Sequence, residues 1–295
     1  MRLDALWSDA KPPTVSFELF PARSEKAAQK LAKTVEELAG ARPDFVSVTF
    51  GAGGSTREGS LALARALKDG QGLEVLAYFN GWGMGPPEVE AILASYRDLG
   101  VQNVLLVRGD PPADGEGPAP HPESFAHASD LLGFVAPRFD FCLGAAGYPE
   151  GHKEAPSLAA DIGYLKLKQE RGARFVIANY FYDNELFFRF RALAVEAGVT
   201  IPIVPGIMPM SSAKMTENLA ALCGAAITPE LRAGMDAVPA GDKDALEAFG
   251  VEFALGQCRG LLRRGVPGLH IYTMDRSAGP VRIVETLRAE GLLPG

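Results

Sequence analysis

Short apolar runs alternate with segments of helical periodicity along the whole chain. Most of the runs are apolar at consecutive positions, which is typical of parallel strands that are covered on both faces. We expect eight strands, at residues 14–20, 44–50, 73–79, 102–108, 140–146, 174–179, 201–206 and 268–273.

Between these runs, apolar residues recur at a spacing of three and four, which places them on one face of a helix. The clearest sets are Leu31, Val35 and Leu38, followed by Val89, Ile92, Leu93 and Tyr96. The same spacing predicts a long helix over about 242–264. Gly40, Gly100 and Gly198 stand where the C-caps of three helices are expected.

Eight strands that alternate with helices predict an α/β fold with a single (β/α)8 TIM barrel as one catalytic domain over 1–295. A doubly wound open sheet is the alternative, because alternation does not show whether the sheet closes. The strand count and the chain length favour the barrel. The longest irregular segment, "DPPADGEGPAPHPES" (110–124), follows the fourth strand, and loops of this length are usually functional or disordered.

The composition is that of a globular protein with a substantial core, at 47% hydrophobic and 22% charged residues. A net charge of −7 argues against nucleic acid or a membrane as partner. The three widely spaced cysteines form no CxxC pattern and fit a reducing compartment. The first thirteen residues lack the apolar core of a signal peptide and no segment is long enough to span a membrane, so we expect a cytoplasmic protein.

The active sites of barrels lie at the carboxyl ends of the strands. We therefore expect the polar side chains at these ends to converge on one mouth. They are Glu18, Thr49, Arg108, Asp110, Tyr148, Glu150, Asn179, Tyr272 and Arg276.

Glu18 stands inside the apolar run "TVSFELF" (14–20). An ionised carboxylate in such surroundings is costly unless it is paired. One interpretation is a structural ion pair with an arginine. The other is a carboxylic acid that keeps its proton between Phe17, Phe20 and the closed mouth, and that donates this proton near neutral pH.

Two glycine-containing segments also follow strands. "VRGDPP" (107–112) indicates either a simple turn or a clamp in which Arg108 meets an anion and Asp110 meets a hydrogen-bond donor. "FGAGGST" (50–56) lacks a dinucleotide fingerprint and predicts a tight turn, with a candidate capping box of Ser55 and Glu58. The four histidines are too dispersed to predict a metal site, and no Ser-His-Asp arrangement indicates a hydrolase.

Seven segments taken together resemble the flavin-dependent methylenetetrahydrofolate reductases. They are "SFELFPAR", "FVSVTFGAGGSTRE", "VRGDPP", "AAGYPEGHKEA", "YFYDNELFFRF", "PIVPGIMPMSS" and "HIYTMDR", in family order from about residue 14 to 276. The resemblance implies a (β/α)8 barrel that holds FAD. It also implies a ping-pong reaction in which NADH or NADPH reduces the flavin, and methylenetetrahydrofolate is then reduced to 5-methyltetrahydrofolate for methionine supply.

The resemblance also implies roles for individual residues. Glu18 matches the general acid that assists opening of the folate's bridging ring, and Asp110 matches a carboxylate near the flavin and the pterin. Matches to cofactor-binding positions are Thr49, Tyr78, Arg108, Gly109, Asp110, His127, Ala128, Tyr148, His152, Asp161 and Lys168. Matches to substrate-binding positions are Glu18, Thr49, Asp110, Asn179, Tyr272 and Arg276.

The chain departs from the family pattern at four positions. Tyr78 replaces a histidine, Asn179 a glutamine, Ala213 an aromatic residue and Leu167 a basic residue. Because the sequence stops at residue 295, we expect no C-terminal regulatory domain of the eukaryotic kind. A homo-oligomer is expected, as in bacterial relatives.

Two other functions remain open at this stage. One is a flavin-free barrel lyase or aldolase with Glu18 as its base, which would need a Schiff-base lysine or metal ligands at the strand ends. The other is a folate- or flavin-binding module without catalysis. The presence of Glu18 and Asp110 favours an enzyme, because binding alone has little use for a proton donor at the reacting face.

Overall fold

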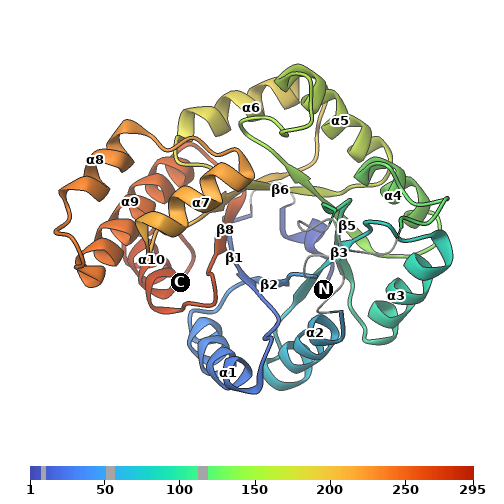
Figure 1. The fold of residues 1–295 in the computed structure, drawn as a ribbon, viewed down its shortest axis with the longest axis horizontal. Coiled ribbons are helices and arrows are strands. Elements are labelled where there is room, and N and C mark those ends of the chain that lie inside the picture. The colour runs from blue at the N-terminus through green and yellow to red at the C-terminus, as the bar shows by residue number, and fades with distance from the viewer. Residues whose placement is uncertain (8–10, 51–56, 112–118) are drawn as a thin grey trace.

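Eight parallel strands form a closed barrel in the computed structural model, which describes residues 1–7, 11–50, 57–111 and 119–295 (Figure 1). The strands are β1 (Thr14–Leu19), β2 (Phe45–Val48), β3 (Val75–Asn80), β4 (Asn103–Val107), β5 (Cys142–Gly147), β6 (Phe175–Tyr180), β7 (Ile203–Ile207) and β8 (Gly268–Tyr272). The first strand pairs with the last, from Thr14 opposite Gly268 to Glu18 opposite Tyr272. This closure confirms the predicted barrel and excludes the open sheet.

The helices surround the barrel as an outer ring (Figure 1). They are α1 (Glu25–Gly40), α2 (Arg57–Gln71), α3 (Pro86–Asp98), α4 (Ala128–Val135), α5 (Leu158–Glu170), α6 (Asn184–Glu196), α7 (Ala213–Cys223), α8 (Pro229–Ala237), α9 (Lys243–Arg263) and α10 (Ala278–Ala289). The long helix expected at 242–264 is confirmed as α9, which begins where the Asp242 side chain accepts the N–H of Ala245 at 2.9 Å. The chain inserts α7 and α8 before α9, so β7 and β8 are joined by three helices.

The two ends of the barrel differ in polarity. At the amino ends of the strands, the rings of Phe45 and Phe175 fill the interior and are fully buried. The N-terminal 3-10 turn (Leu3–Trp7) packs the Trp7 ring against both of them. Because strand residues alternate in direction, Phe17 and Leu19 face the helices while Glu18 faces the interior. The polar mouth therefore lies at the carboxyl ends.

The helix ends agree with the sequence at two of three glycines. Gly100 and Gly198 follow α3 and α6 with φ of +69° and +87°. The prediction for Gly40 is wrong, because this residue is the last of α1 and Arg42 takes the left-handed conformation with φ of +46°. Residues 51–56, with Ser55 of the candidate capping box, and residues 112–118 of the long irregular segment lie outside the described residues.

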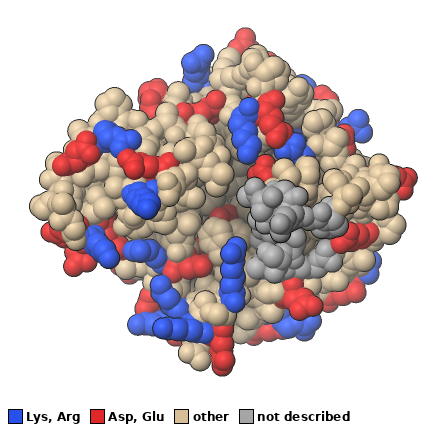
Figure 2. Space-filling model, in the orientation of Figure 1, with Lys and Arg blue, Asp and Glu red and all other residues tan. Residues whose placement is uncertain are grey.

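Surface charge is mixed: basic and acidic side chains are interspersed over the face in Figure 2, which is hollowed near its centre. Within the described ranges, no helix is both long enough and apolar enough to cross a membrane.

Candidate active site

Glu18 is the buried carboxylate of the mouth, with 4% of its surface exposed. Its ion-pair neighbour is a histidine rather than the arginine of the structural interpretation: Oε2 lies 3.7 Å from His270 Nε2. This distance is too long for a hydrogen bond. Across the described residues, Oε2 has no hydrogen-bond partner. A buried acceptor without a partner is costly, so this atom marks a place that a ligand, a water molecule or a proton would complete.

His270 forms the polar floor beneath Glu18, and sequence analysis missed it. The imidazole is fully buried on β8, with Nδ1 2.8 Å from Ser16 Oγ and Nε2 3.4 Å from Ser47 Oγ. The serines and the histidine come from three adjacent strands, β1, β2 and β8. One signal was available: His270 precedes Tyr272 by two residues and therefore faces the same side of its strand.

Two tyrosines flank Glu18. Burial and the nearby charge of Glu18 raise the pKa of Tyr78 and of Tyr272 well above the usual value. Both phenols therefore stay neutral and able to donate a hydrogen bond. The Tyr272 hydroxyl donates to the Ala178 carbonyl at 3.4 Å, and its ring packs over Gly206, where a Cβ atom would lie 2.6 Å from the ring.

The predicted residues of the fifth strand–helix unit come together. His152 donates its backbone N–H to Asp161 Oδ2 at 3.1 Å, and its ring lies 4.7 Å from that of Tyr148. Lys168 Nζ lies 5.8 Å from the Tyr148 ring and donates to the Ala146 carbonyl at 2.9 Å. Burial lowers the pKa of Lys168 and raises the pKa of Asp161, and the opposite charge of each opposes the shift of the other. The unit therefore offers a cation and a phenol at the mouth.

The end of β4 presents Arg108 and Asp110 on either side of a glycine in the left-handed conformation. Gly109 has φ of +84°, and a Cβ atom there would lie 1.7 Å from Asn80 Oδ1. Only glycine fits this turn. The Asp110 side chain is 65% exposed at the rim, 3.8 Å from Arg108 and 3.4 Å from Lys153.

Glu154, another residue that sequence analysis missed, holds Arg108 by two hydrogen bonds of 2.7 and 2.9 Å. This pairing raises the pKa of Arg108 and lowers the pKa of Glu154. An anionic ligand at Arg108 would have to share the guanidinium with Glu154 or replace it. The signal was present in the sequence, since Glu154 lies two residues after His152 in the same motif.

Thr49 carries a second buried polar atom without a partner. Its Oγ1 has no hydrogen bond to any described residue, while its backbone N–H donates to the Leu19 carbonyl at 3.1 Å. His127 and Ala128 lie at the start of α4, where the His127 N–H donates to Asp130 Oδ2 at 3.1 Å. A helix start of this kind suits a polar or anionic group.

The remaining predicted residues lie on β6 and in the segments that follow β5 and β8. Asn179 is half-buried on β6, and Arg276 is exposed after β8 with a 3.0 Å ion pair to Glu247 of α9. Glu150 accepts the N–H of Ala226 at 3.0 Å, so its carboxylate ties the β5 loop to the chain after α7. Glu150 and Arg276 are therefore each tied to another part of the chain.

Tyr180 and Tyr182 are further buried groups that sequence analysis did not single out. Their hydroxyls have no hydrogen-bond partner in the part of the chain that the structure describes. Burial raises the pKa of Tyr182 to about 12. Both rings belong to a cluster with Met208 and Met210 beside α7 and α8.

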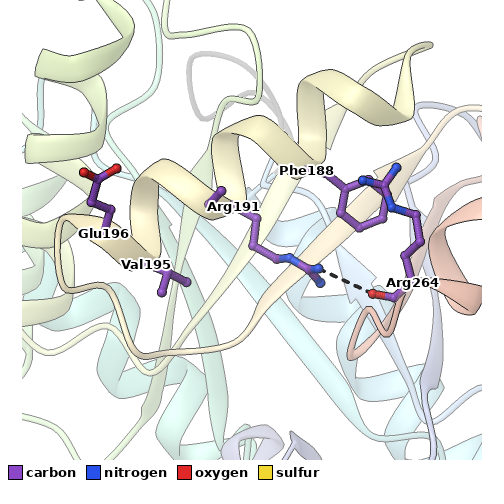
Figure 3. Close-up of a pocket in the computed structure, with 6 residues that line it drawn as sticks. Phe188, Arg191, Val195, Glu196 and Arg264 are labelled. Carbon is purple, nitrogen blue, oxygen red and sulfur yellow. Dashed lines mark hydrogen bonds between the residues drawn. The ribbon is translucent and has the colours of Figure 1, made fainter.

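A depression of about 530 Å³ on the outer wall is separate from the mouth (Figure 3). It lies along α6 and is lined by Phe188, Arg191, Ala192, Val195, Glu196 and Arg264. Arg264 stacks on the Phe188 ring at 3.4 Å, and Arg191 donates to the Arg264 carbonyl at 3.4 Å. The arginines are thus already engaged, and this depression is not part of the site. In the described residues, no group of three or more His, Cys, Asp or Glu side chains is placed to bind a metal.

The closed barrel and its mouth, with a buried acid, neutral phenols and half-buried cations, are those of a (β/α)8 enzyme. A family model described as methylenetetrahydrofolate reductase matches residues 3–288. The chain is 34% identical over 282 residues to the 5,10-methylenetetrahydrofolate reductase of Escherichia coli, covering 95% of this chain and 92% of that protein. The chain therefore belongs to the methylenetetrahydrofolate reductase family of oxidoreductases, as its motifs indicated.

A plant relative and a solved structure are also similar to this chain. It is 33% identical over 283 residues to the methylenetetrahydrofolate reductase (NADH) 1 of Arabidopsis thaliana, and it spans about half of that relative, 48% of its length. A solved structure of an uncharacterised protein from Clostridium thermocellum that binds two copies of 5-methyl-5,6,7,8-tetrahydrofolic acid aligns with a TM-score of 0.66. At 15% identity over 95% of this chain and 96% of that chain, this likeness concerns the fold alone.

Proposed function

We propose that this chain reduces 5,10-methylenetetrahydrofolate to 5-methyltetrahydrofolate with NADH or NADPH in a ping-pong reaction through bound FAD, with Glu18 as general acid. Family membership over residues 3–288 supports the reaction. The observation that carries the residue assignment is the inward-facing Glu18 Oε2, which is buried and has no hydrogen-bond partner among the described residues.

The mouth suits a flavin dinucleotide. Arg108 and Lys168 supply positive charge for its pyrophosphate or polar edges, Tyr148 supplies a ring surface, and the unpartnered Thr49 hydroxyl supplies a hydrogen bond. We propose that Tyr78, Gly109, Asp110, His127, Ala128, His152 and Asp161 complete the cofactor site. When bound, FAD supplies the hydride chemistry, while the protein positions it and excludes water.

Glu18 is suited to the proton transfer that the folate half-reaction needs. An amine nitrogen leaves poorly unless it is protonated, and a buried carboxylic acid within hydrogen-bonding distance of it supplies the proton. His270 and the two serines beneath Glu18 give the carboxyl group a polar floor on the side away from the substrate. We propose that Asn179, Tyr272 and Arg276 bind the folate and nicotinamide side of the mouth.

Asp110 is assigned a different task because its surroundings differ. It lies exposed at the rim, between the cationic side chains of Arg108 and Lys153. We propose that this negative charge favours the cationic iminium form of the folate. The two carboxylates of the mouth are thereby divided between proton donation and charge stabilisation.

We extend the proposal to a cytoplasmic homo-oligomer. All three cysteines are free, and burial raises the pKa of Cys142 to about 11 and of Cys258 to about 12, so both thiols stay protonated. This state suits a reducing compartment.

A visible absorption spectrum before and after anaerobic addition of NADH tests the function. We expect a flavin spectrum that bleaches with NADH and recovers on addition of methylenetetrahydrofolate. A colourless protein that takes up no FAD on reconstitution would overturn the proposal and favour the lyase. A flavin that binds but never bleaches with NADH or NADPH would favour the binding module.

A further inference from the structure

The junction between β1 and β8 at the mouth is held by side chains. The strand ladder ends at Glu18 opposite Tyr272. Beyond it, Thr273 Oγ1 donates to the Glu18 carbonyl at 2.6 Å, and Asp275 Oδ1 accepts the N–H of Phe20 at 3.1 Å. The N–H of Asp275 donates to Thr273 Oγ1 at 3.2 Å, so the two side chains belong to one hydrogen-bonded turn. Two side chains of one turn therefore bind the backbone on both sides of Leu19, the residue that follows Glu18 and ends β1.

The turn that carries these side chains is strained. Met274 and Asp275 have φ of +50° and +54°, the left-handed region that non-glycine residues rarely adopt. Aspartate tolerates this conformation better than most residues. Two contacts with α1 help to hold the turn: Thr34 Oγ1 reaches the Asp275 carbonyl at 3.5 Å, and Ser277 Oγ donates to Glu37. Strain that is maintained by several independent contacts often lies at functional sites.

The charge of Asp275 also reaches Glu18. Burial raises the pKa of Asp275 and the charge of Glu18 raises it further, whereas the Phe20 N–H and Lys30 of α1 oppose the shift. Glu37 of α1 and the adjacent Arg276 complete the charged groups around the turn. Glu18 itself faces Tyr78 of β3 and, on β8, His270 and Tyr272.

We propose that Asp275 is a positioning residue for Glu18: its carboxylate fixes the backbone that directly follows Glu18, and it places a second carboxylate beside the acid. Because Arg276 is the next residue, the same turn also sets where this arginine stands at the rim. The part of this role that concerns folate reduction rests on the proposed function.

Two substitutions separate the geometric and the electrostatic contributions. Asp275→Asn keeps a side-chain oxygen for the Phe20 N–H and a residue that tolerates a left-handed φ, but removes the charge. Asp275→Ala removes both. Asp98→Asn, an exposed carboxylate near the end of α3, is the matched control for the loss of one surface charge.

The first readout is an infrared titration of the Glu18 carboxyl band, which is assigned by its loss in Glu18→Gln and needs no turnover. We expect Asp275→Asn to move this titration to lower pH, and Asp98→Asn to leave it in place. The second readout is the pair of half-reactions in stopped flow. We expect Asp275→Ala to slow folate reduction by about tenfold and to leave flavin reduction by NADH within about twofold, because misplacement affects the acid alone. In Asp275→Asn, the rate of folate reduction should return close to the wild-type rate at acidic pH.

Three results would decide the matter. An unmoved Glu18 titration in Asp275→Asn would overturn the electrostatic role, and equal slowing of both half-reactions in Asp275→Ala would reduce Asp275 to a structural residue. If wild-type protein reduces no folate but the titration still moves, the proposed function is wrong while the coupling between Asp275 and Glu18 stands.

Discussion

Substitution of Gly109 by alanine tests whether the end of β4 is built as the structure shows. A non-glycine residue in the left-handed region costs about 1–2 kcal/mol. The new Cβ atom, 1.7 Å from Asn80 Oδ1, would also push Asn80 away from the Trp82 N–H that it accepts at 2.9 Å. Loss of that hydrogen bond costs about 1 kcal/mol, so the free energy of unfolding should fall by about 2–3 kcal/mol.

The matched control is Gly100→Ala. Gly100 has a similar φ of +69°, but its nearest heavy atom to a new Cβ would be Lys68 Cε at 4.0 Å. It should therefore show the backbone cost alone, about 1–2 kcal/mol. In an Asn80→Ala background, Gly109→Ala should no longer lose the contribution of the Asn80–Trp82 hydrogen bond. The two positions should therefore show a coupling free energy of about 1 kcal/mol.

Urea unfolding followed by circular dichroism measures these differences, with all variants compared in the same ligand state because bound cofactor would add to stability. Equal destabilisation by Gly109→Ala and Gly100→Ala, or no coupling with Asn80, would refute the geometry assigned to this turn. That result would also weaken the placement of Arg108 and Asp110, which the turn presents on either side of Gly109.

Three further predictions follow from the same region and from the core. Asp110→Asn should make the bound flavin easier to reduce, because it removes a nearby negative charge; a potential that is unchanged or lower in a dye-equilibration assay would count against the placement of Asp110. Arg108 lowers the pKa of Glu154 in the folded protein. The pair therefore stabilises the fold fully at pH values above the pKa of a glutamate in the unfolded chain, and this contribution is lost as the pH falls through the lower pKa of the folded state. Glu154→Gln should accordingly show a weaker loss of stability on acidification than wild type, as measured by unfolding at a series of pH values, and an unchanged slope would contradict the pairing. In native protein at pH 8, a thiol reagent should modify Cys223 alone, because Cys142 and Cys258 are buried and protonated, whereas denatured protein should yield all three thiols.

The strands could be predicted from the sequence because parallel strands buried on both faces leave uninterrupted apolar runs. The helix periods were equally clear where one face is buried, as for Val89 and Tyr96 on α3. Gly40 was assigned wrongly because a glycine is also tolerated as the last helical residue. The left-handed position passed to Arg42, and Pro43 after it disfavours a further helical turn. The two extra helices before α9 carry short apolar stripes that did not stand out.

The candidate site could be predicted only where its residues lie on strand ends. Glu18, Asn179 and Tyr272 follow from their positions on β1, β6 and β8. His270 was missed because its spacing of two residues from Tyr272 gains weight only when the register shows that it lies opposite Ser16. Glu154 stands in a motif segment, but its pairing with Arg108, 46 residues away, could not be predicted. Asp275 could not be found, because its partner Phe20 lies 255 residues away in the chain.

The two half-reactions of Glu18→Gln, measured separately, test whether Glu18 is the general acid of folate reduction. Stopped-flow absorption would follow flavin reduction by NADH and then flavin reoxidation by methylenetetrahydrofolate, in wild type and in the variant. We expect the variant to reduce its flavin with NADH at a rate within about twofold of wild type. Its rate of folate reduction should fall by at least about a hundredfold, because only this second step needs the proton of Glu18. Equal losses in both half-reactions, or folate reduction at the wild-type rate, would contradict the assignment of Glu18 as the general acid.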